Sequence, residues 1–360
     1  MIRFLHAGDF HLDSPFASLS GEQAAQRRRE QRSQLREIGA LAADCDLVFL
    51  AGDLLDSARA YGETLEALEE FFAGIRAHVF IAPGNHDYYT PQSPYGRMTL
   101  PENVHLFTSP RPEAVELPEL GCSVWGMAFT AARSRARLEG FRVPEDGKTN
   151  FMVLHGDALM PDSPYNPISR EEIAESGLTY LALGHVHSYS GPRREGATLW
   201  AYPGCTLGRG FDETGEKGLI LGQAEGQDCS IRFQPLSGRR YEILPVDVTE
   251  AESLEGALRA ALPADASGQI FRLILRGEWE EKPALEALEE ALKDCCWHLS
   301  LRDETRLRQD LWEKAGEDTL RGNFLRILRE QYQTAEEAEK EKIMLAARFG
   351  LAALDYREEL

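Results

Sequence analysis

The feature that most constrains this chain is a series of short apolar segments that each end in aspartate, asparagine or histidine. Residues 79–82 are the run Val-Phe-Ile-Ala, which a Pro-Gly pair ends before Asn85, His86 and Asp87 follow. Short runs rich in β-branched and aromatic residues predict buried strands. Polar groups at the carboxyl ends of such strands lie at the edge where open α/β sheets keep their ligand sites.

Four other apolar runs, at residues 2–7, 47–51, 151–154 and 180–183, end in the same kinds of residue. They are followed by Asp9 and His11, by Asp53 and Asp56, by His155, and by His185 and His187. Together with His86, these positions hold five of the nine histidines. Because residues i and i+2 of an extended segment point the same way, Asp-x-His and His-x-His can each direct two groups to one place. Oxygen and imidazole groups without thiolate suit manganese, iron or zinc rather than a structural zinc cage.

Each of these pieces has an ordinary structural explanation when it is taken alone. An isolated Asp-x-His is more often a loop than a ligand pair, and Gly-Asp at a strand end is usually only a turn. His155 alone could be a hydrogen-bonded histidine of the core. It is the conjunction of five separate strand ends, each carrying ligand-type residues, that indicates one metal site.

The order of the predicted elements indicates an α/β protein with more than one domain. Helices predicted at residues 21–43 and 61–77 alternate with the first three strands, as in a sheet covered by helices. A second, more β-rich set of strands follows. We expect residues 1–240 to form one domain, residues 241–303 a compact α/β unit, and residues 304–360 a helical C-terminal region.

Charge and composition restrict the partners of this chain. It has 59 acidic and 39 basic residues, a formal net charge of −20, which is the wrong sign for coating nucleic acid by bulk electrostatics. No apolar run approaches the roughly 18 residues of a membrane span, and the N-terminus lacks the layout of a signal peptide. The six cysteines form no Cys-x-x-Cys pair and are interpreted as reduced thiols. We therefore expect a cytoplasmic protein with no membrane attachment.

The series of motifs resembles that of the calcineurin-like metallophosphoesterases. It reads Asp9-x-His11, Gly52-Asp53-x-x-Asp56, Gly84-Asn85-His86-Asp87, His155-Gly156 and Gly184-His185-x-His187. The resemblance covers about the first 190 residues and implies a four-layer α/β/β/α sandwich with two metal ions at the sheet edge. A small α/β capping domain and a helical C-terminal tail would complete the fold.

The resemblance also implies a role for each matching residue. One metal ion would be held by Asp9, His11, Asp53 and His187, and the other by Asp53, Asn85, His155 and His185, with Asp53 bridging the two. Hydroxide held between the metals would attack phosphorus while His86 assists the leaving oxygen, and Asp56 would orient His86. We expect Mn²⁺, with Fe²⁺, Zn²⁺ and Mg²⁺ as alternatives. Asp87 belongs to the motif, but no chemical role follows for it beyond support of the turn.

Two stretches, residues 6–16 and 202–218, resemble the DNA-repair exonuclease branch of the family, the SbcD and YhaO-like proteins. This narrower resemblance implies a DNA exonuclease or endonuclease that docks through its helical C-terminal region onto an SMC-like ATPase. Arg209 in the second stretch either contacts a phosphate or pairs with Asp212 or Glu213. The arginines at residues 27–36 form either a solvated helix face or a basic strip for substrate. The apolar residues of the tail pack either onto a partner or onto the protein's own cap.

The acidic balance keeps other functions open. Residues 241–300 carry 13 acidic and 5 basic side chains, so the expected cap has a net charge of −8. A first alternative is therefore a phosphodiesterase that acts on nucleotides or other small phosphodiesters. A second is a non-catalytic scaffold with a phosphoesterase fold, although a scaffold has no need of His86. The sequence leaves a homodimer open.

Overall fold

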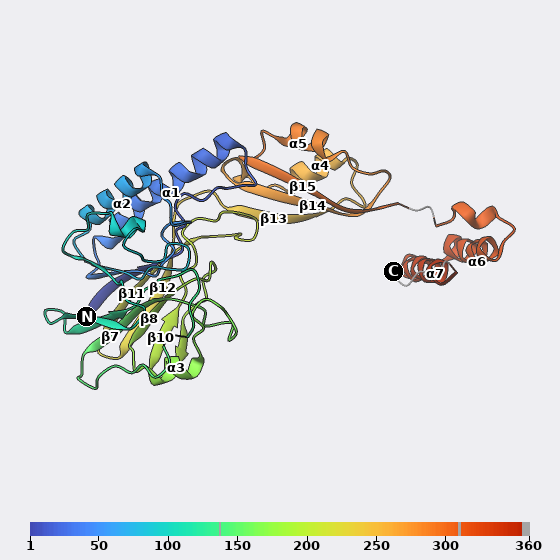
Figure 1. Ribbon diagram of the computed structural model, residues 1–360. Helices are drawn as coiled ribbons and strands as arrows, with labels where there is room; N and C mark the ends of the chain where they lie inside the picture. Colours follow the sequence, from blue (N-terminus) through green and yellow to red (C-terminus); the bar gives the residue numbers. More distant parts are fainter. Residues whose placement is uncertain (137, 309–310, 355–360) are drawn as a thin grey trace. The chain divides into compact units, whose positions relative to one another are not determined.

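A computed structural model of the protein describes residues 1–136, 138–308 and 311–354 (Figure 1). The chain forms two compact units. The first comprises Met1–Ile243, Ala264–Arg272 and Cys296–Leu299, and the second comprises Leu244–Pro263, Leu273–Cys295 and the chain from Ser300 onward. The domain boundaries expected after residues 240 and 303 stay a prediction.

The first sheet of the larger unit gathers the N-terminal apolar runs. Its order is β12-β11-β1-β2-β3-β4, in which β1 to β4 run parallel and β11 and β12 are antiparallel at one side. Strands of a sheet that is covered on both faces read as continuous apolar runs, as the central strands β1, β2 and β3 do. The strands are β1 (Ile2–Ala7), β2 (Leu47–Leu50), β3 (His78–Ile81), β4 (Val104–Leu106), β11 (Gly218–Glu225) and β12 (Asp228–Pro235).

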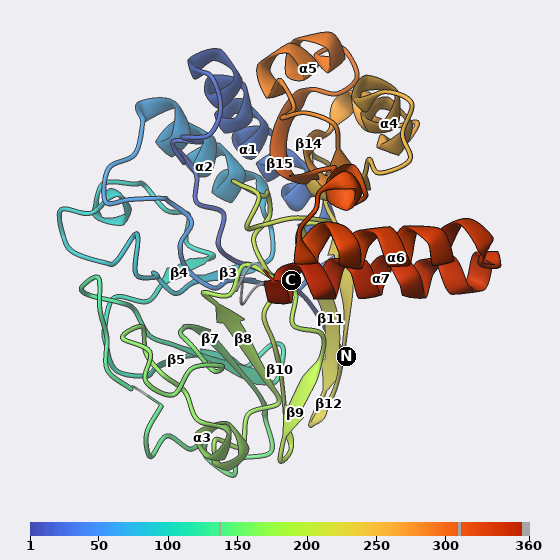
Figure 2. The ribbon, with the colours of Figure 1, turned by 90° about the vertical axis from the view of Figure 1, so that its right-hand side faces the viewer.

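The second sheet has the order β5-β6-β7-β8-β10-β9, with β6, β7, β8 and β10 parallel (Figure 2). Its strands are β5 (Glu113–Leu117), β6 (Cys122–Gly126), β7 (Thr149–His155), β8 (Tyr180–Gly184), β9 (Arg193–Glu195) and β10 (Thr198–Ala201). The two edge strands, β5 and β9, are not predicted from the sequence. Both are rich in charged residues, so neither shows the apolar run that identifies the central strands.

Aromatic side chains fill the space between the two sheets. The ring of Phe4 in β1 lies 5.4 Å from Phe49 in β2, 5.6 Å from Phe151 in β7 and 4.8 Å from Tyr180 in β8, measured between centroids. Aromatic pairs at such separations stabilise a core beyond the area that they bury. This contact fixes the sheets face to face and brings the carboxyl ends of their central strands to a common place.

Helices cover the outer face of the first sheet more completely than that of the second. Helices α1 (Gly21–Ala42) and α2 (Gly62–Gly74) bury Leu35, Ile38, Leu68 and Phe72 against it. The second sheet is covered by the short helix α3 (Arg170–Glu175) and by irregular segments that contribute Leu138, Val143 and Ile168. Ser169 and Glu172 form a capping box at the start of α3. The predicted α/β/β/α fold class is confirmed.

The second unit contains most of a three-stranded sheet of order β13-β14-β15 and the C-terminal helices. Its elements are β13 (Tyr241–Asp247), α4 (Leu254–Ala261), β14 (Ile270–Trp279), α5 (Leu285–Leu292), β15 (His298–Leu307), α6 (Leu320–Thr334) and α7 (Glu337–Leu354). The first residues of all three strands belong to the first unit. Docking of α6 and α7 onto an ATPase stays a prediction.

The helical region begins later than the sequence predicts. Strand β15 continues to Leu307, whereas residues from 304 onward are expected to be helical. Exposed Arg302, Glu304 and Arg306 alternate with partly buried Asp303 and Thr305. This period of two is that of a strand, so the prediction for residues 304–307 is wrong.

No helix within the described ranges is long and apolar enough to cross a membrane. All six cysteines are free thiols: Cys45, Cys122, Cys205, Cys229, Cys295 and Cys296. Burial raises the pKa of Cys122 to about 12 and that of Cys45 to about 11, so these two are inert thiols.

Histidine 6 is a buried residue of β1 whose imidazole stays neutral in the folded protein. Its Nδ1 lies 2.8 Å from the Tyr180 hydroxyl and its Nε2 lies 3.2 Å from the Leu183 carbonyl oxygen. Because a carbonyl can only accept, Nε2 carries the proton and Nδ1 accepts from the tyrosine. Burial lowers the pKa of His6 to about 3.

We predict that His6 makes the protein less stable in mild acid. Between pH 6.5 and 3 the unfolded chain binds a proton that the folded protein excludes, so stability is complete above pH 6.5 and falls below it. The expected loss is about 2 kcal/mol between pH 6.5 and 5. Guanidinium unfolding of the wild type and of His6→Gln, with chelator present, would measure it. An equal acid sensitivity in both proteins would contradict the prediction.

Candidate metal centre

Five parallel strands deliver the predicted ligands to the junction of the two sheets. Strands β1, β2 and β3 end just before Asp9, Asp53 and Asn85, and β7 and β8 lead to His155 and His185. The loop after β1 is joined to the loop after β2 by four main-chain hydrogen bonds: Asp9 N to Gly52 O, His11 N to Asp53 O, Leu12 N to Leu54 O and Asp56 N to Leu12 O. The first sheet thus presents its ligand loops as one connected layer.

One group of donor atoms comes from Asp9, His11 and His187, whose donor atoms all lie within 4.8 Å of one another. The Nε2 atoms of His11 and His187 are 3.2 Å apart, and His187 Nε2 is 3.7 Å from Asp9 Oδ1. Two nitrogens that each bind one ion at roughly 2.1 Å stand about this far apart. The arrangement therefore fits a divalent ion held by these three residues.

A second group surrounds His155. Its Nε2 lies 3.0 Å from Asn85 Oδ1 and 3.5 Å from Asp53 Oδ2. The same oxygen of Asp53 lies 3.7 Å from His11 Nε2 in the first group. Asp53 therefore stands between the two groups, in the place that a bridging carboxylate needs.

His185 lies beside this centre, on the side of the second sheet, but its ring nitrogens belong to none of the groups of donor atoms that lie within 4.8 Å of one another among the described residues. Its ring packs against that of His155 with centroids 5.3 Å apart, and its main-chain N–H donates to the Asp9 carboxylate. Its Nε2 is 3.8 Å from an oxygen of Asp157. Burial lowers the pKa of His185, which favours the neutral imidazole that binds metals.

The backbone of the centre is strained at the ligands themselves. Asp9, His11, Asp53 and His185 all have positive φ angles, of 52°, 44°, 50° and 115°. Non-glycine residues in this region cost of order 1–3 kcal/mol each and cluster at functional sites. The surrounding hydrogen bonds maintain this conformation, which aims several side chains at one point.

The two central carboxylates are buried without a lysine or arginine partner in the part of the chain that the structure describes. Asp9 and Asp53 are almost fully buried and are faced by imidazoles and main-chain N–H groups. Burial alone would raise the pKa of Asp53, but His155, His11 and His86 bring it below its usual value. Buried charge needs a counter-charge, so the donor set fits divalent cations.

Asp87, whose role the sequence leaves open, holds two ligand loops together. Its Oδ2 accepts from the Leu54 and Leu55 N–H groups and, at 2.5 Å, from the Tyr95 hydroxyl, while Oδ1 accepts from Gly84 N. These contacts tie the loop that carries Asp53 to the loop that carries Asn85. Burial and the nearby Asp53 raise the pKa of Asp87.

His86 lies at the exposed side of the centre and is oriented differently from the expectation. Its Nδ1 lies 2.9 Å from the main-chain carbonyl oxygen of Asp56, not from the Asp56 carboxylate. That carboxylate accepts from Ser14 and Arg209 and lies 3.2 Å from His11 Nδ1. The Arg209 guanidinium, on a distant segment, draws the side chain toward the first group of ligands.

Arg209 forms an ion pair with Glu213, one of the alternatives that the sequence leaves open. The Nη2–Oε1 distance is 2.6 Å, and the same glutamate oxygen lies 2.7 Å from His187 Nδ1. Sequence reasoning does not assign Glu213, Ser14 or Tyr95 to the centre. Only Glu213 carries a local signal, its place four residues after Arg209 in the stretch 202–218.

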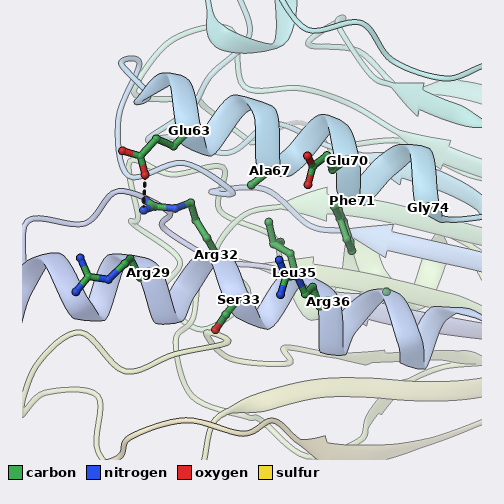
Figure 3. Close-up of a pocket in the computed structure, with 11 residues that line it drawn as sticks. Arg29, Arg32, Ser33, Leu35, Arg36, Glu63, Ala67, Glu70, Phe71 and Gly74 are labelled. Carbon is green, nitrogen blue, oxygen red and sulfur yellow. Dashed lines mark hydrogen bonds and ion pairs between the residues drawn. The ribbon is translucent and has the colours of Figure 1, made fainter.

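The arginine cluster of α1 does not form one solvated face. Arg27 is buried and paired with a glutamate, and Arg32 pairs with Glu63 at 2.8 Å. Arg29, Arg32 and Arg36 line a hollow of about 560 Å³ between α1 and α2 (Figure 3). Another residue of this helix, Gln31, donates to the carbonyl oxygens of Phe10 and His11 in the loop after β1. None of the predicted ligands lines the hollow, so the hollow is separate from the metal centre.

The sequence matches the calcineurin-like phosphoesterase family over residues 2–189, a range that includes every strand end described above. The chain belongs to this family. It is also similar to the uncharacterized metallophosphoesterase YhaO of Bacillus subtilis (strain 168), with 31% identity over 350 residues that cover 86% of this chain and 83% of that protein. Membership supports a metal-dependent phosphoesterase, a hydrolase of phosphate esters.

We predict that a single methyl group at Gly84 disrupts the centre. A Cβ at this position would clash with the Asp53 carboxylate and lie 2.7 Å from the Asp53 main-chain nitrogen. Gly84→Ala should therefore weaken metal binding about 10–100-fold, as other displacements of supporting groups do. Metal analysis after manganese loading would measure this. Gly74→Ala, where a Cβ meets nothing within 4 Å, is the control and should bind normally.

Proposed function

We propose that this protein is a manganese-dependent nuclease that cleaves phosphodiester bonds of DNA, as an exonuclease or endonuclease in DNA repair. The observation that carries the proposal is an exposed imidazole, His86, beside a buried set of oxygen and imidazole ligands. The choice of DNA is supported by residues 6–16 and 202–218, which resemble the DNA-repair exonuclease branch.

The donor atoms would divide between two metal positions. Asp9, His11 and His187 would hold one ion, and Asn85, His155 and His185 the other, with Asp53 shared. Bound divalent ions activate water for attack at neutral pH and neutralise charge on the phosphoryl oxygens. Oxygen and imidazole donors without thiolate suit Mn²⁺, Fe²⁺ or Zn²⁺, of which we propose Mn²⁺, with Mg²⁺ as a further alternative.

The chain itself would supply the proton for the leaving oxygen. The carbonyl of Asp56 can only accept, so His86 Nδ1 donates to it and Nε2 is the atom free to exchange a proton. The His86 and His11 rings are 4.8 Å apart between centroids, which keeps His86 next to the ligands. The main-chain nitrogen of His86 donates to Asp53 Oδ1 at 2.8 Å, so the loop that carries the acid also fixes the shared carboxylate.

We predict that His86→Ala lowers the turnover of bis-p-nitrophenyl phosphate and of linear DNA by about 10²–10⁴-fold, because general acid assistance is lost. The metal content should stay at the wild-type value, since all seven proposed ligands, which do not include His86, would remain in place. Manganese-dependent hydrolysis and metal analysis on the same preparations would measure both quantities. Metal-loaded wild-type protein that hydrolyses neither substrate would exclude the proposed function.

Small phosphodiesters or nucleotides are the second candidate substrates, and the net charge of −20 favours them. Substitution of the arginines that line the hollow between α1 and α2 can distinguish the two candidate substrates, because only DNA is long enough to contact them as well as the centre. Gln31 of α1 donates to the carbonyl oxygens of Phe10 and His11, so this helix is joined directly to the metal loop. A DNA strand that reaches the centre would have the exposed Arg29 and Arg36 of this helix available to its phosphates.

We predict that the double variant Arg29→Glu, Arg36→Glu binds DNA at least tenfold more weakly at low salt, with a smaller salt dependence, because fewer phosphates are neutralised. Hydrolysis of bis-p-nitrophenyl phosphate should be unchanged, since these residues lie outside the centre. Arg170→Glu, an exposed arginine of α3, is the control. Unchanged DNA binding, or efficient competition by nucleotides against DNA, would favour the small-substrate function.

A further inference from the structure

A segment outside the ligand motifs contacts the imidazoles of the first metal position. Glu213 lies in the loop between β10 and β11 and is 5% exposed. Its Oε1 is 2.7 Å from His187 Nδ1, and its Oε2 accepts from the Arg209 main-chain N–H at 2.8 Å. Arg209 Nη2 completes the contact with Glu213 Oε1 at 2.6 Å.

The contact at His187 defines which nitrogen faces the metal position. Arg209 Nη2 also lies 3.0 Å from His187 Nδ1. Arginine can only donate and an ionised carboxylate can only accept, so one of these two neighbours must be the true partner. The shorter distance is that to Glu213, which requires a proton on Nδ1. In the neutral imidazole, the form that binds a metal, His187 Nε2 is then unprotonated and lies 3.2 Å from His11 Nε2.

Arg209 extends the same network to the second imidazole. Its Nη1 lies 3.1 Å from Asp56 Oδ1, and this oxygen lies 3.2 Å from His11 Nδ1. The hydroxyl of Ser14 also donates to it, at 2.8 Å. The contact with His11 is electrostatic rather than a well-aligned hydrogen bond, because His11 Nδ1 has no partner of good geometry among the described residues. The carboxylate nevertheless faces Nδ1 and leaves Nε2 for the metal position.

A purely structural ion pair or a phosphate contact explains this network less well. The Arg209 guanidinium pairs with two carboxylates and its side chain is only 21% exposed, so few of its N–H groups remain to bind a substrate phosphate. One arginine between Asp56 and Glu213 also leaves an excess negative charge. Excess negative charge beside two imidazoles raises their basicity as ligands, which is how such outer partners act at metal sites.

We propose that Glu213, Arg209 and Asp56 are positioning residues that fix His11 and His187 as Nε2 ligands of one metal ion and leave the other ion's ligands unaffected. This inference rests on the metal centre of the proposed function but not on the identity of the substrate. None of the three residues need touch the substrate. Glu213 and Arg209 also lie beyond the region, residues 2–189, over which the chain matches its family.

The test measures metal binding, so it does not depend on nuclease activity. Glu213→Gln, Arg209→Met and Asp56→Asn should each weaken one of two manganese sites about 10–100-fold. Calorimetric titration should resolve one weakened and one normal site. At a free manganese concentration that fills the normal site but not the weakened one, the variants should hold about half of the metal that the wild type binds. The matched control is Arg239→Met, because Arg239 pairs with Glu30 at 3.0 Å and the two are 24% and 22% exposed, close to Arg209 and Asp56.

A second readout follows the tautomer directly. In metal-free wild-type protein, ¹⁵N NMR should show His187 protonated on Nδ1, and Glu213→Gln should mix the two tautomers. The Arg209→Met, Glu213→Gln double variant should lose little more affinity than either single variant, since the residues act as one unit.

Wild-type affinity at both sites, or equal loss at both sites in a folded variant, would overturn the proposal. If Glu213→Gln does not fold, Arg209→Met and Asp56→Asn decide the question alone. A wild type that binds two ions but does not cleave DNA would contradict only the proposed function.

Discussion

The burial of two carboxylates at the junction of two sheets is the constraint on which this structure depends. Asp9 and Asp53 are removed from water, yet their neighbours in the described chain are imidazoles and main-chain N–H groups. An uncompensated buried charge costs several kcal/mol, even after relaxation. Divalent cations beside these two carboxylates would supply the missing counter-charge and so offset this cost.

The surrounding structure maintains a local geometry that the backbone would otherwise avoid. The positive φ angles of Asp9, His11 and Asp53 are held by the hydrogen bonds between the loops after β1 and β2 and by the Asp87 carboxylate. At His185, whose φ angle is also positive, the main-chain N–H donates to the Asp9 carboxylate. Gly184 allows β8 to approach the Ala51 carbonyl more closely than any side chain would permit. Local strain and close approach are thus the means by which ligands from separate strands converge.

The residues that the structure brings together at the candidate centre could be predicted from the sequence, because each follows a local signal, an apolar strand that ends in aspartate, asparagine or histidine. The supporting residues could not be predicted in the same way. Arg209 is 153 positions from Asp56 in the sequence. No local pattern could therefore predict that the Asp56 carboxylate pairs with Arg209 while His86 contacts the Asp56 main-chain carbonyl. Strands β5 and β9 could not be predicted because edge strands need no apolar run. The end of β15 at Leu307 could not be predicted because an exposed charged strand resembles a charged helix in composition.

The centre also joins the two halves of the sandwich. The first sheet supplies Asp9, His11, Asp53 and Asn85, and the second supplies His155, His185 and His187. Cations shared by these residues would bind only when the sheets are packed on one another, as they are through the aromatic contacts of Phe4. By mass action, ligands that bind only the folded state stabilise it. Bound cations would therefore strengthen the contact between the two sheets that brings their ligands together. Packing of the core and assembly of the metal centre would then be one cooperative event.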